Sequence, residues 1–403
     1  MKRCLAALLA ACLLTSSALA DSLEANDLFD PYAAPVLAPD ALEAVSAAAP
    51  TISAPSAVLM EKSTGAVLCE LDCHKQYEPA SVTKVMTLLL VFEALDAGVL
   101  TLDQPVTAST HAISMGGSQI WLKENEQLTV DEMLKAVTVV SANDCAVALA
   151  EAVAGSEEAF VSRMNQRAQE LGMRDTHFLN CTGLPAEGHL TSAYDIALMS
   201  RELILNHPDI RKYSTIWMDS LRDGASLLVN TNKLVRFYPG TTGLKTGSTA
   251  SALYCLSATA ERDGMELIAV VMHAASPDDR FESAKALLNY GFAGYTLASI
   301  APEQALPPVP VLLGQAPAVQ PVPAGSPTVL LEKSQAGSLS QSISLCPDVE
   351  APVEAGQVLG KLTVSAGDRV VAEVPLVAAH GVDRISALGI YRSLLRALFL
   401  AAE

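Results

Sequence analysis

The sequence predicts a mixed α/β (α+β) protein with a large first domain over residues 54–295. Within that range, strand-like segments lie at both ends and helix-like segments lie between them. This order favours one sheet that pairs its first and last strands. A glycine-punctuated, strand-rich stretch over residues 328–380 predicts a second, small β-rich domain. The last residues, 381–403, have the periodicity of an amphipathic helix.

The first 20 residues have the features of a secretory signal peptide. Two basic residues precede an apolar run over residues 4–14, and small residues lead to an expected cleavage after Ala20. Lipoprotein-type processing at Cys12 is the less favoured alternative, because it would leave an unusually short apolar run. Residues 21–53, rich in Ala and Pro, are expected to form a poorly ordered lead-in. The signal predicts an exported protein at the outer face of the cytoplasmic membrane, periplasmic or extracellular.

Charge and cysteine content narrow the classes of function. The chain has 26 basic and 44 acidic residues, a formal charge of −18, which argues against a nucleic-acid partner. Six cysteines follow the signal, and their irregular spacing favours buried free thiols with at most one bridge, such as Cys69 with Cys73. A disulfide framework of all six is the alternative. Neither cysteines nor histidines have zinc-ligand spacing, so we expect no metal and no cofactor.

The elements of the first domain follow from periodicity and from punctuating residues. A strand–turn–strand unit is expected over residues 57–68, and Pro79 predicts a helix that begins near Ser81. Two strands are expected to flank the turn Arg262-Asp263-Gly264. Four central helices, these two strands and a final helix are predicted over residues 129–140, 144–153, 157–171, 191–206, 252–259, 266–272 and 276–289.

Composition changes after this domain. The proline-rich residues 296–327 are expected to form a linker or a sheet edge. Short strands are expected at residues 328–331, 357–364 and 369–377. The wide apolar face of the tail, with Arg392 and Arg396 opposite, predicts a helix that lies in a membrane surface. The alternative is a helix docked on its own domain.

The first motif that carries chemistry is Ser81-Val82-Thr83-Lys84. At this spacing the hydroxyl of Ser81 and the amine of Lys84 lie on one face of a helix, about one turn apart. A serine hydroxyl becomes a strong nucleophile when a neighbouring base takes its proton. Burial and a nearby cation both favour an uncharged lysine that acts as that base. We predict that Ser81 is the nucleophile and Lys84 the general base.

The second motif, Ser141-Ala142-Asn143, lies between two expected helices. Such a short loop presents both polar side chains to a cleft. Ser141 is predicted to relay a proton, and Asn143 to hold a substrate amide with its donor and acceptor. The alternative is a helix cap at Asn143 or Asp144.

The third motif, Lys245-Thr246-Gly247-Ser248, lies on an expected strand. Lys245 offers a positive charge to a substrate carboxylate, and Thr246 adds a hydroxyl donor. Gly247 permits the close approach of a substrate backbone. The backbone N–H of Ser248, with that of Ser81, is predicted to form an oxyanion hole.

Together these three motifs resemble the serine-type D-alanyl-D-alanine carboxypeptidases, which are low-molecular-mass penicillin-binding proteins. The resemblance runs from about residue 54 to the end of the chain. It is carried by Ala80-Ser81-Val82-Thr83-Lys84-Val85-Met86-Thr87, Ser141-Ala142-Asn143-Asp144, Leu171-Gly172-Met173-Arg174-Asp175-Thr176-His177-Phe178, Thr182-Gly183-Leu184 and Gly243-Leu244-Lys245-Thr246-Gly247.

The resemblance implies a β-lactamase/transpeptidase-like catalytic domain, a β-rich domain and a membrane-associating helix. The implied substrate is a peptidoglycan stem peptide that ends in D-Ala-D-Ala, with β-lactam antibiotics as covalent inhibitors and a role in cell-wall synthesis and cell shape. The resemblance also implies that Arg280 helps to bind the terminal carboxylate of the substrate. A solvated arginine at a helix start is the alternative for Arg280.

Two other functions remain open from the sequence. The motif spacings suit a β-lactamase equally well, but residues 177–181 lack the carboxylate that a class A enzyme uses for deacylation. A non-catalytic wall-binding relative is the second alternative, although every motif residue is present. The sequence has no G-x-S-x-G elbow, which argues against a Ser-His-Asp hydrolase.

Overall fold

The protein is described here by a computed structural model. It describes residues 49–391 apart from 301, 303–304, 325–327, 335–338 and 367–368, together with Leu394. The expected signal peptide and most of the lead-in lie outside these residues. Within the described part, no helix combines the length and the apolar character needed to cross a membrane.

A five-stranded antiparallel sheet forms the centre of the first domain, in the order β2-β1-β9-β8-β7. The expected pairing of first and last strands is confirmed, since β1 pairs with β9. β7 lies at one edge of the sheet and carries the third motif. The strands are β1 Ser56–Glu61, β2 Val67–Leu71, β7 Thr241–Thr249, β8 Leu253–Arg262 and β9 Met265–Ala274.

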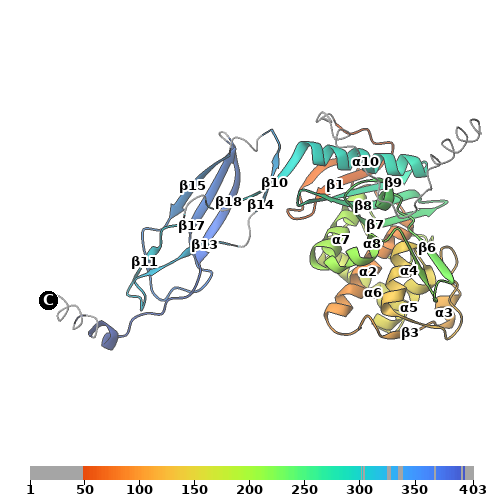
Figure 1. Cartoon of the computed structure of the whole chain (residues 1–403), viewed down its shortest axis with the longest axis horizontal. Helices are drawn as coiled ribbons and strands as arrows, with labels where there is room; N and C mark the ends of the chain where they lie inside the picture. Colours follow the sequence, from red (N-terminus) through yellow and green to blue (C-terminus); the bar gives the residue numbers. More distant parts are fainter. Residues whose placement is uncertain are drawn as a thin grey trace, which may run out of the picture. The chain divides into compact units, whose positions relative to one another are not determined.

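Both faces of this sheet are buried, because successive side chains of a strand point to opposite faces. In β1, Val58 and Met60 pack into the core shared with the central helices. Ala57 and Leu59 pack into the core that includes α10 (Pro277–Gly294). Figure 1 accordingly shows α10 on one side of the sheet and α7 and α2 on the other. This double burial explains why the strands have continuous apolar runs instead of alternating ones.

The central helices follow the sequence predictions closely. The expected helix at Ser81 begins with a short 3₁₀ turn and continues as α2, which is buried along most of its length. Thr129 and Glu132 form a capping box at the start of α4. The helices and short strands are η2 Ala80–Thr83, α2 Lys84–Asp96, β3 Pro105–Thr107, α3 Thr110–Ile113, β4 Gln127–Thr129, α4 Val130–Val139, α5 Asn143–Ala154, α6 Glu157–Glu170, α7 Ala193–Asn206, η3 Pro208–Ile210, α8 Arg211–Ser214, β5 Met218–Leu221, β6 Ser226–Val229 and α9 Leu234–Phe237.

The β-rich part that follows contains a four-stranded sheet in the order β13-β18-β17-β15. The proline-rich stretch over residues 296–327, expected to form a linker or a sheet edge, contains most of β10 and all of β11, β12 and β13. Its strand β13 lies at a sheet edge, where proline removes no ladder hydrogen bond. The strands are β10 Tyr295–Ser299, β11 Val309–Leu312, β12 Ala318–Val319, β13 Pro321–Pro323, β14 Thr328–Glu332, β15 Leu339–Leu345, β16 Val349–Glu350, β17 Val358–Ala366 and β18 Arg369–Ala378.

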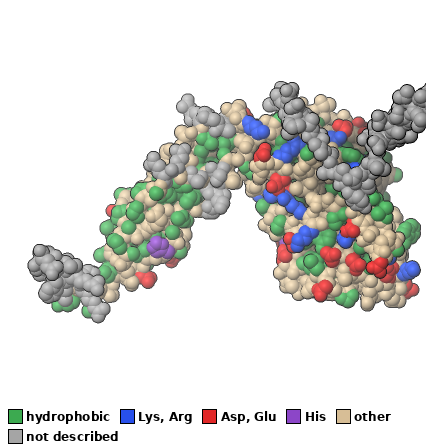
Figure 2. Space-filling model, viewed as in Figure 1, with side chains coloured by type: hydrophobic (Ala, Val, Ile, Leu, Met, Phe, Trp, Pro, Cys, Tyr) green, Lys and Arg blue, Asp and Glu red, His purple; other side chains and the backbone are tan. Residues whose placement is uncertain are grey.

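The surfaces of the two parts differ in composition. Figure 2 shows acidic and basic side chains interspersed on the first domain, whereas the visible face of the β-rich part is mainly hydrophobic or uncharged. Exposed apolar side chains of that part include Leu312, Ile343, Val358 and Val370.

The helix expected over residues 381–403 is present in part. Residues 387–391 and Leu394 are helical, whereas residues 381–386 are not, because Val382 and Arg384 pair in β-bridges with Val353 and Gly314. Arg392 and Arg396 lie outside the described residues. All six cysteines beyond the signal are free thiols, and Cys69 and Cys73 form no bridge. Four of the six are buried: Cys73, Cys145, Cys181 and Cys255.

Candidate active site

The hydroxyl and amine of the first motif meet at the junction of η2 and α2. Pro79 occupies the N-cap position of η2. Ser81 therefore lies in the 3₁₀ turn, and Lys84 is the first residue of α2. Lys84 Nζ lies 3.2 Å from Ser81 Oγ. The Lys84 side chain is fully buried, whereas Ser81 remains partly accessible. The predicted pairing of these residues is therefore present in the structure.

Three oxygen atoms surround the amine of Lys84. Besides Ser81 Oγ, it contacts Asn143 Oδ1 at 2.5 Å and the carbonyl oxygen of Thr182 at 2.7 Å. The latter two oxygens accept hydrogen bonds but cannot donate them. An uncharged amine has two hydrogens and one lone pair. When both hydrogens go to the two carbonyl oxygens, the lone pair faces the hydroxyl of Ser81.

Burial depresses the pKa of the Lys84 amine to about 7, and the thiol of Cys181 and the carboxylate of Asp144 act in the opposite direction. The amine of Lys245 is also buried, and its pKa lies well below its usual value. Burial is the main cause there, followed by repulsion from Lys84 and then from Arg280. An uncharged Lys84 near neutral pH is therefore consistent with its surroundings.

The second motif supplies Asn143 from the first turn of α5. Its Nδ2 donates to the carbonyl oxygen of Gly116 at 2.6 Å, while its Oδ1 faces Lys84. These two contacts fix the orientation of the amide and leave one Nδ2 hydrogen for a ligand. The predicted two-sided binding of a substrate amide is therefore reduced to a single donor.

Ser141 occupies a strained position before this helix. Its backbone φ is +66°, a conformation that non-glycine residues adopt rarely. Its hydroxyl is buried and has no hydrogen-bond partner within the described part of the chain. Strain and an unpaired buried hydroxyl at one residue are features of functional positions. The structure does not hydrogen-bond Ser141 to Ser81 or Lys84.

The third motif lies on edge strand β7, directly against the nucleophile turn. A Cβ added at Gly247 would lie 2.8 Å from the carbonyl oxygen of Pro79 and 2.9 Å from the N atoms of Ser81 and Val82. Only glycine permits this approach. Thr246 Oγ1 donates to Thr231 Oγ1 at 2.7 Å, and Ser248 is exposed.

Arg280 is buried behind the same strand, at 7% exposure. Its Nη1 donates to the carbonyl oxygens of Gly247 at 3.3 Å and Cys255 at 3.4 Å. Its guanidinium lies 4.5 Å from the ring centre of Phe281. The alternative of a solvated arginine is therefore wrong. Arg280 is joined to the third motif through the Gly247 carbonyl.

Sequence reasoning missed the contribution of backbone carbonyl groups. Thr182 and Gly116 act on Lys84 and Asn143 through main-chain oxygens, which no side-chain pattern reveals. Gly183 packs so tightly that an added Cβ would lie 1.8 Å from the carbonyl oxygen of Ala80. In the sequence, only the family resemblance marks the segment Thr182-Gly183-Leu184.

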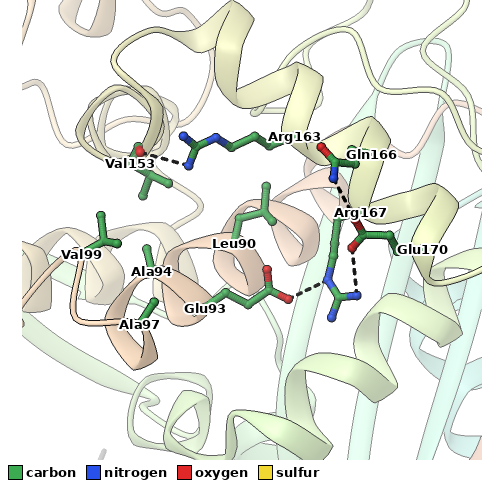
Figure 3. Close-up of a pocket in the computed structure, with 10 residues that line it drawn as sticks. All are labelled: Leu90, Glu93, Ala94, Ala97, Val99, Val153, Arg163, Gln166, Arg167 and Glu170. Atoms are coloured by element: carbon green, nitrogen blue, oxygen red, sulfur yellow. Dashed lines mark hydrogen bonds and ion pairs between the residues drawn. The ribbon is translucent and has the colours of Figure 1, made fainter.

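A separate cavity of about 340 Å³ lies between α2, α5 and α6, toward the far end of α2 from Lys84. Figure 3 shows Arg167 beside Glu93 and Glu170, and Arg163 turned toward the Val153 carbonyl. These cations are thus paired within the protein, and none of the three motifs lines this cavity.

A buried lysine amine against a serine hydroxyl, opposite a sheet edge, defines a serine acyl-transfer enzyme. A family model described as D-alanyl-D-alanine carboxypeptidase matches residues 43–276. A second, described as the C-terminal domain of penicillin-binding protein 5, matches residues 301–384. The chain belongs to the D-alanyl-D-alanine carboxypeptidase family of penicillin-binding proteins.

Individual relatives are similar to this chain over 60% to 83% of its length. The D-alanyl-D-alanine carboxypeptidase DacF of Bacillus subtilis is 42% identical over 336 residues, which cover 82% of this chain and 86% of the relative. The crystal structure of penicillin-binding protein 5 from Haemophilus influenzae has 29% identity and a TM-score of 0.75, covering 83% and 99% of the two chains. Penicillin-binding protein D2 from Listeria monocytogenes in its ampicillin-bound form has 31% identity and a TM-score of 0.55, covering 60% and 98%.

Proposed function

We propose that this chain is a serine D-alanyl-D-alanine carboxypeptidase that removes the terminal D-alanine from peptidoglycan stem peptides. The observation that carries the proposal is the set of three oxygens around Lys84. Two of them are carbonyl oxygens and the third is the Ser81 hydroxyl. This set directs the lone pair of a neutral amine at the nucleophile.

The reaction follows from these positions. Lys84 takes the proton of Ser81, whose Oγ attacks the carbonyl carbon between the two D-alanines. The amide bond breaks, the departing amine takes a proton back through Lys84 or the buried Ser141 hydroxyl, and D-alanine leaves. Water then cleaves the ester on Ser81 and frees the shortened peptide.

The edge strand β7 provides the surface that binds the extended substrate peptide. An edge strand pairs with an extended peptide through main-chain hydrogen bonds, and Gly247 brings that edge next to Ser81. The N–H groups of Ser81 and Ser248 stabilise the oxyanion. Lys245 and Thr246 receive the terminal carboxylate, and Arg280 supports them through the Gly247 carbonyl. Asn143 donates its remaining Nδ2 hydrogen to the substrate backbone.

β-Lactam antibiotics are the proposed covalent inhibitors. Their strained amide presents the same carbonyl to Ser81, and the resulting ester is hydrolysed slowly. The ampicillin-bound form of a relative with 31% identity supports this proposal. Rapid turnover of a chromogenic cephalosporin would instead indicate the β-lactamase alternative.

The test is the substitution Ser81→Ala. The variant is expected to release no D-alanine from a diacetyl-lysyl-D-alanyl-D-alanine peptide and to show no covalent labelling by a fluorescent penicillin. Its thermal unfolding should match the parent, because Ser81 is partly exposed. Retained labelling in a folded variant contradicts the proposal, and wild-type protein that binds wall peptides without releasing D-alanine indicates the non-catalytic alternative.

We also propose that the protein acts outside the cytoplasmic membrane. The features of residues 1–20 support export, and the arginine-bearing apolar tail supports attachment to the membrane surface. Peptidoglycan lies in the same compartment.

A further inference from the structure

A loop between α3 and β4 lies against the amide of the second motif. The carbonyl oxygen of Gly116 accepts from Asn143 Nδ2, and that of Ser118 accepts from the Asn143 backbone N at 2.7 Å. Gly117 approaches the same Nδ2, since an added Cβ would lie 3.0 Å from it. This loop therefore forms one wall of the proposed site.

Trp121, further along the loop, combines a highly exposed side chain with a left-handed backbone conformation. Its side chain is 73% exposed, although indole is among the largest apolar groups in proteins. Its φ of +60° lies in the left-handed region, which costs a bulky side chain about 1–2 kcal/mol. Strain of this kind persists only where the surroundings hold it, and it is common at ligand sites.

The groups that hold Trp121 in place are buried. The carboxylate of Asp144, which is fully buried, accepts from the backbone N of Ile120 at 3.2 Å and of Leu122 at 3.0 Å. Ile120 and Leu122 are themselves buried at 6% exposure. Arg222 donates to the Ile120 carbonyl oxygen at 2.8 Å. Both neighbours of Trp121 are thus anchored inward, and the indole is kept at the surface.

We propose that Trp121 is a specificity-determining residue that packs against the substrate on the N-terminal side of the scissile bond. The inference rests on the proposed function. The matching ligand chemistry is an apolar, C–H-rich face, either an amino-sugar ring of the glycan or an aliphatic side chain of the stem peptide. An indole ring is suited to either, because it provides a large rigid contact surface.

Contacts and burial support this position. Asn143 links the two regions, because its Oδ1 contacts Lys84 while its Nδ2 and backbone N contact the loop that carries Trp121. The site is closed behind the nucleophile, since Lys84 and Lys245 are at most 1% exposed. The remote part of a substrate must therefore lie across the accessible surface, to which the exposed indole of Trp121 belongs.

The experiment compares Trp121→Ala and Trp121→Phe with the parent on two substrates. One is the diacetyl-lysyl-D-alanyl-D-alanine peptide and the other is a disaccharide pentapeptide. Trp121→Ala is expected to raise KM about 5- to 20-fold on at least one substrate, with kcat and penicillin labelling within twofold. Trp121→Phe should recover most of the loss. Val99→Ala, at an exposed residue beside the cavity of Figure 3, is the matched control and should change nothing.

The outcomes separate the two ligand sources. A KM effect on the disaccharide substrate alone assigns Trp121 to the sugar, and an effect on both assigns it to the peptide. An unchanged KM on both substrates overturns the proposal. Failure of the wild-type protein to label with penicillin overturns the proposed function instead, and that result is independent of Trp121.

Fluorescence gives a readout that does not need catalysis. The chain has two tryptophans, so Trp217→Phe leaves Trp121 as the single indole. Titration with the disaccharide tetrapeptide product, and separately with diacetyl-lysyl-D-alanine, should shift or quench its emission with at least one of them. Unchanged emission with both ligands at saturating concentration overturns the proposal.

Discussion

At the scale of single residues, the active site depends on the protonation state of Lys84 and on two glycines that allow close main-chain packing. Burial lowers the pKa of Lys84, although Cys181 and Asp144 act to raise it. Two carbonyl oxygens then direct its lone pair at Ser81. Gly183 and Gly247 allow the main chains of three segments to meet around that pair.

The pH dependence of acylation follows from the lysine. A protonated amine has no lone pair, so activity requires the neutral form, which predominates above the pKa of about 7. The rate of penicillin acylation is expected to fall about tenfold per pH unit below 7 and to level off above it. Asp144→Asn removes a charge that raises the pKa of Lys84, so the midpoint should move to lower pH. A rate that stays constant from pH 5 to 9 contradicts the assignment of Lys84 as the base.

Gly183→Ala tests the close packing beside the nucleophile. The new Cβ would lie 1.8 Å from the Ala80 carbonyl oxygen, so the backbone must move. We expect the free energy of unfolding to fall by about 3 kcal/mol or more and acylation to be lost. Gly172→Ala is the matched control, because its φ of +76° is similar but no atom lies within 4 Å of the new Cβ. Urea denaturation of both variants gives the comparison, and equal losses would mean that backbone strain alone matters.

At the scale of helices and strands, most of the fold could be predicted from the sequence. α4, α5, α6 and α7 lie within a few residues of their predicted bounds, because caps and periodicity are local signals. The strands β11, β12 and β13 were not predicted individually, because prolines are typical both of linkers and of sheet edges.

The site was predictable in part for the same reason. The side chains of Ser81, Lys84 and Asn143 lie in contact, as the first two motifs predict. The carbonyl oxygens of Thr182 and Gly116 were not predictable, because any residue type has one. The inward position of Arg280 depends on the packing of α10 against β8, which is a tertiary feature.

The ion cluster at Arg167 joins three helices and gives a prediction at this scale. Arg167 pairs with Glu93 of α2 at 2.7 Å and Glu202 of α7 at 2.5 Å. Arg167→Ala should lower the free energy of unfolding by about 1–3 kcal/mol and leave penicillin acylation unchanged. Lys212→Ala, which breaks an exposed pair with Asp209, should cost at most about 0.5 kcal/mol. Chemical denaturation measures both, and equal effects would show that the cluster contributes no more than a surface pair.

At the scale of the whole molecule, two folded parts are followed by a tail with its own expected role. The hydrophobic clusters that surround the active site draw their buried residues from positions 54–292. The β-rich part has two separate clusters of its own. Removal of the tail is therefore expected to leave acylation by the first domain intact and to abolish any attachment of the protein to a membrane surface.

A chain ending at residue 386 tests that separation. It should acylate with penicillin at the rate of the mature chain, yet lose co-sedimentation with vesicles that contain anionic lipid, because Arg392 and Arg396 are removed. Equal co-sedimentation of the two chains contradicts the membrane role. A lowered melting temperature of the truncated chain would favour the helix docked on its own domain.

The unpaired state of the six cysteines in the described part of the chain has a further consequence. Within the described residues no disulfide stabilises the fold, so its stability comes from non-covalent packing, hydrogen bonds and ion pairs. Maturation should then need no thiol oxidase or disulfide isomerase, and the protein should reach its active form equally well in a reducing or an oxidising medium.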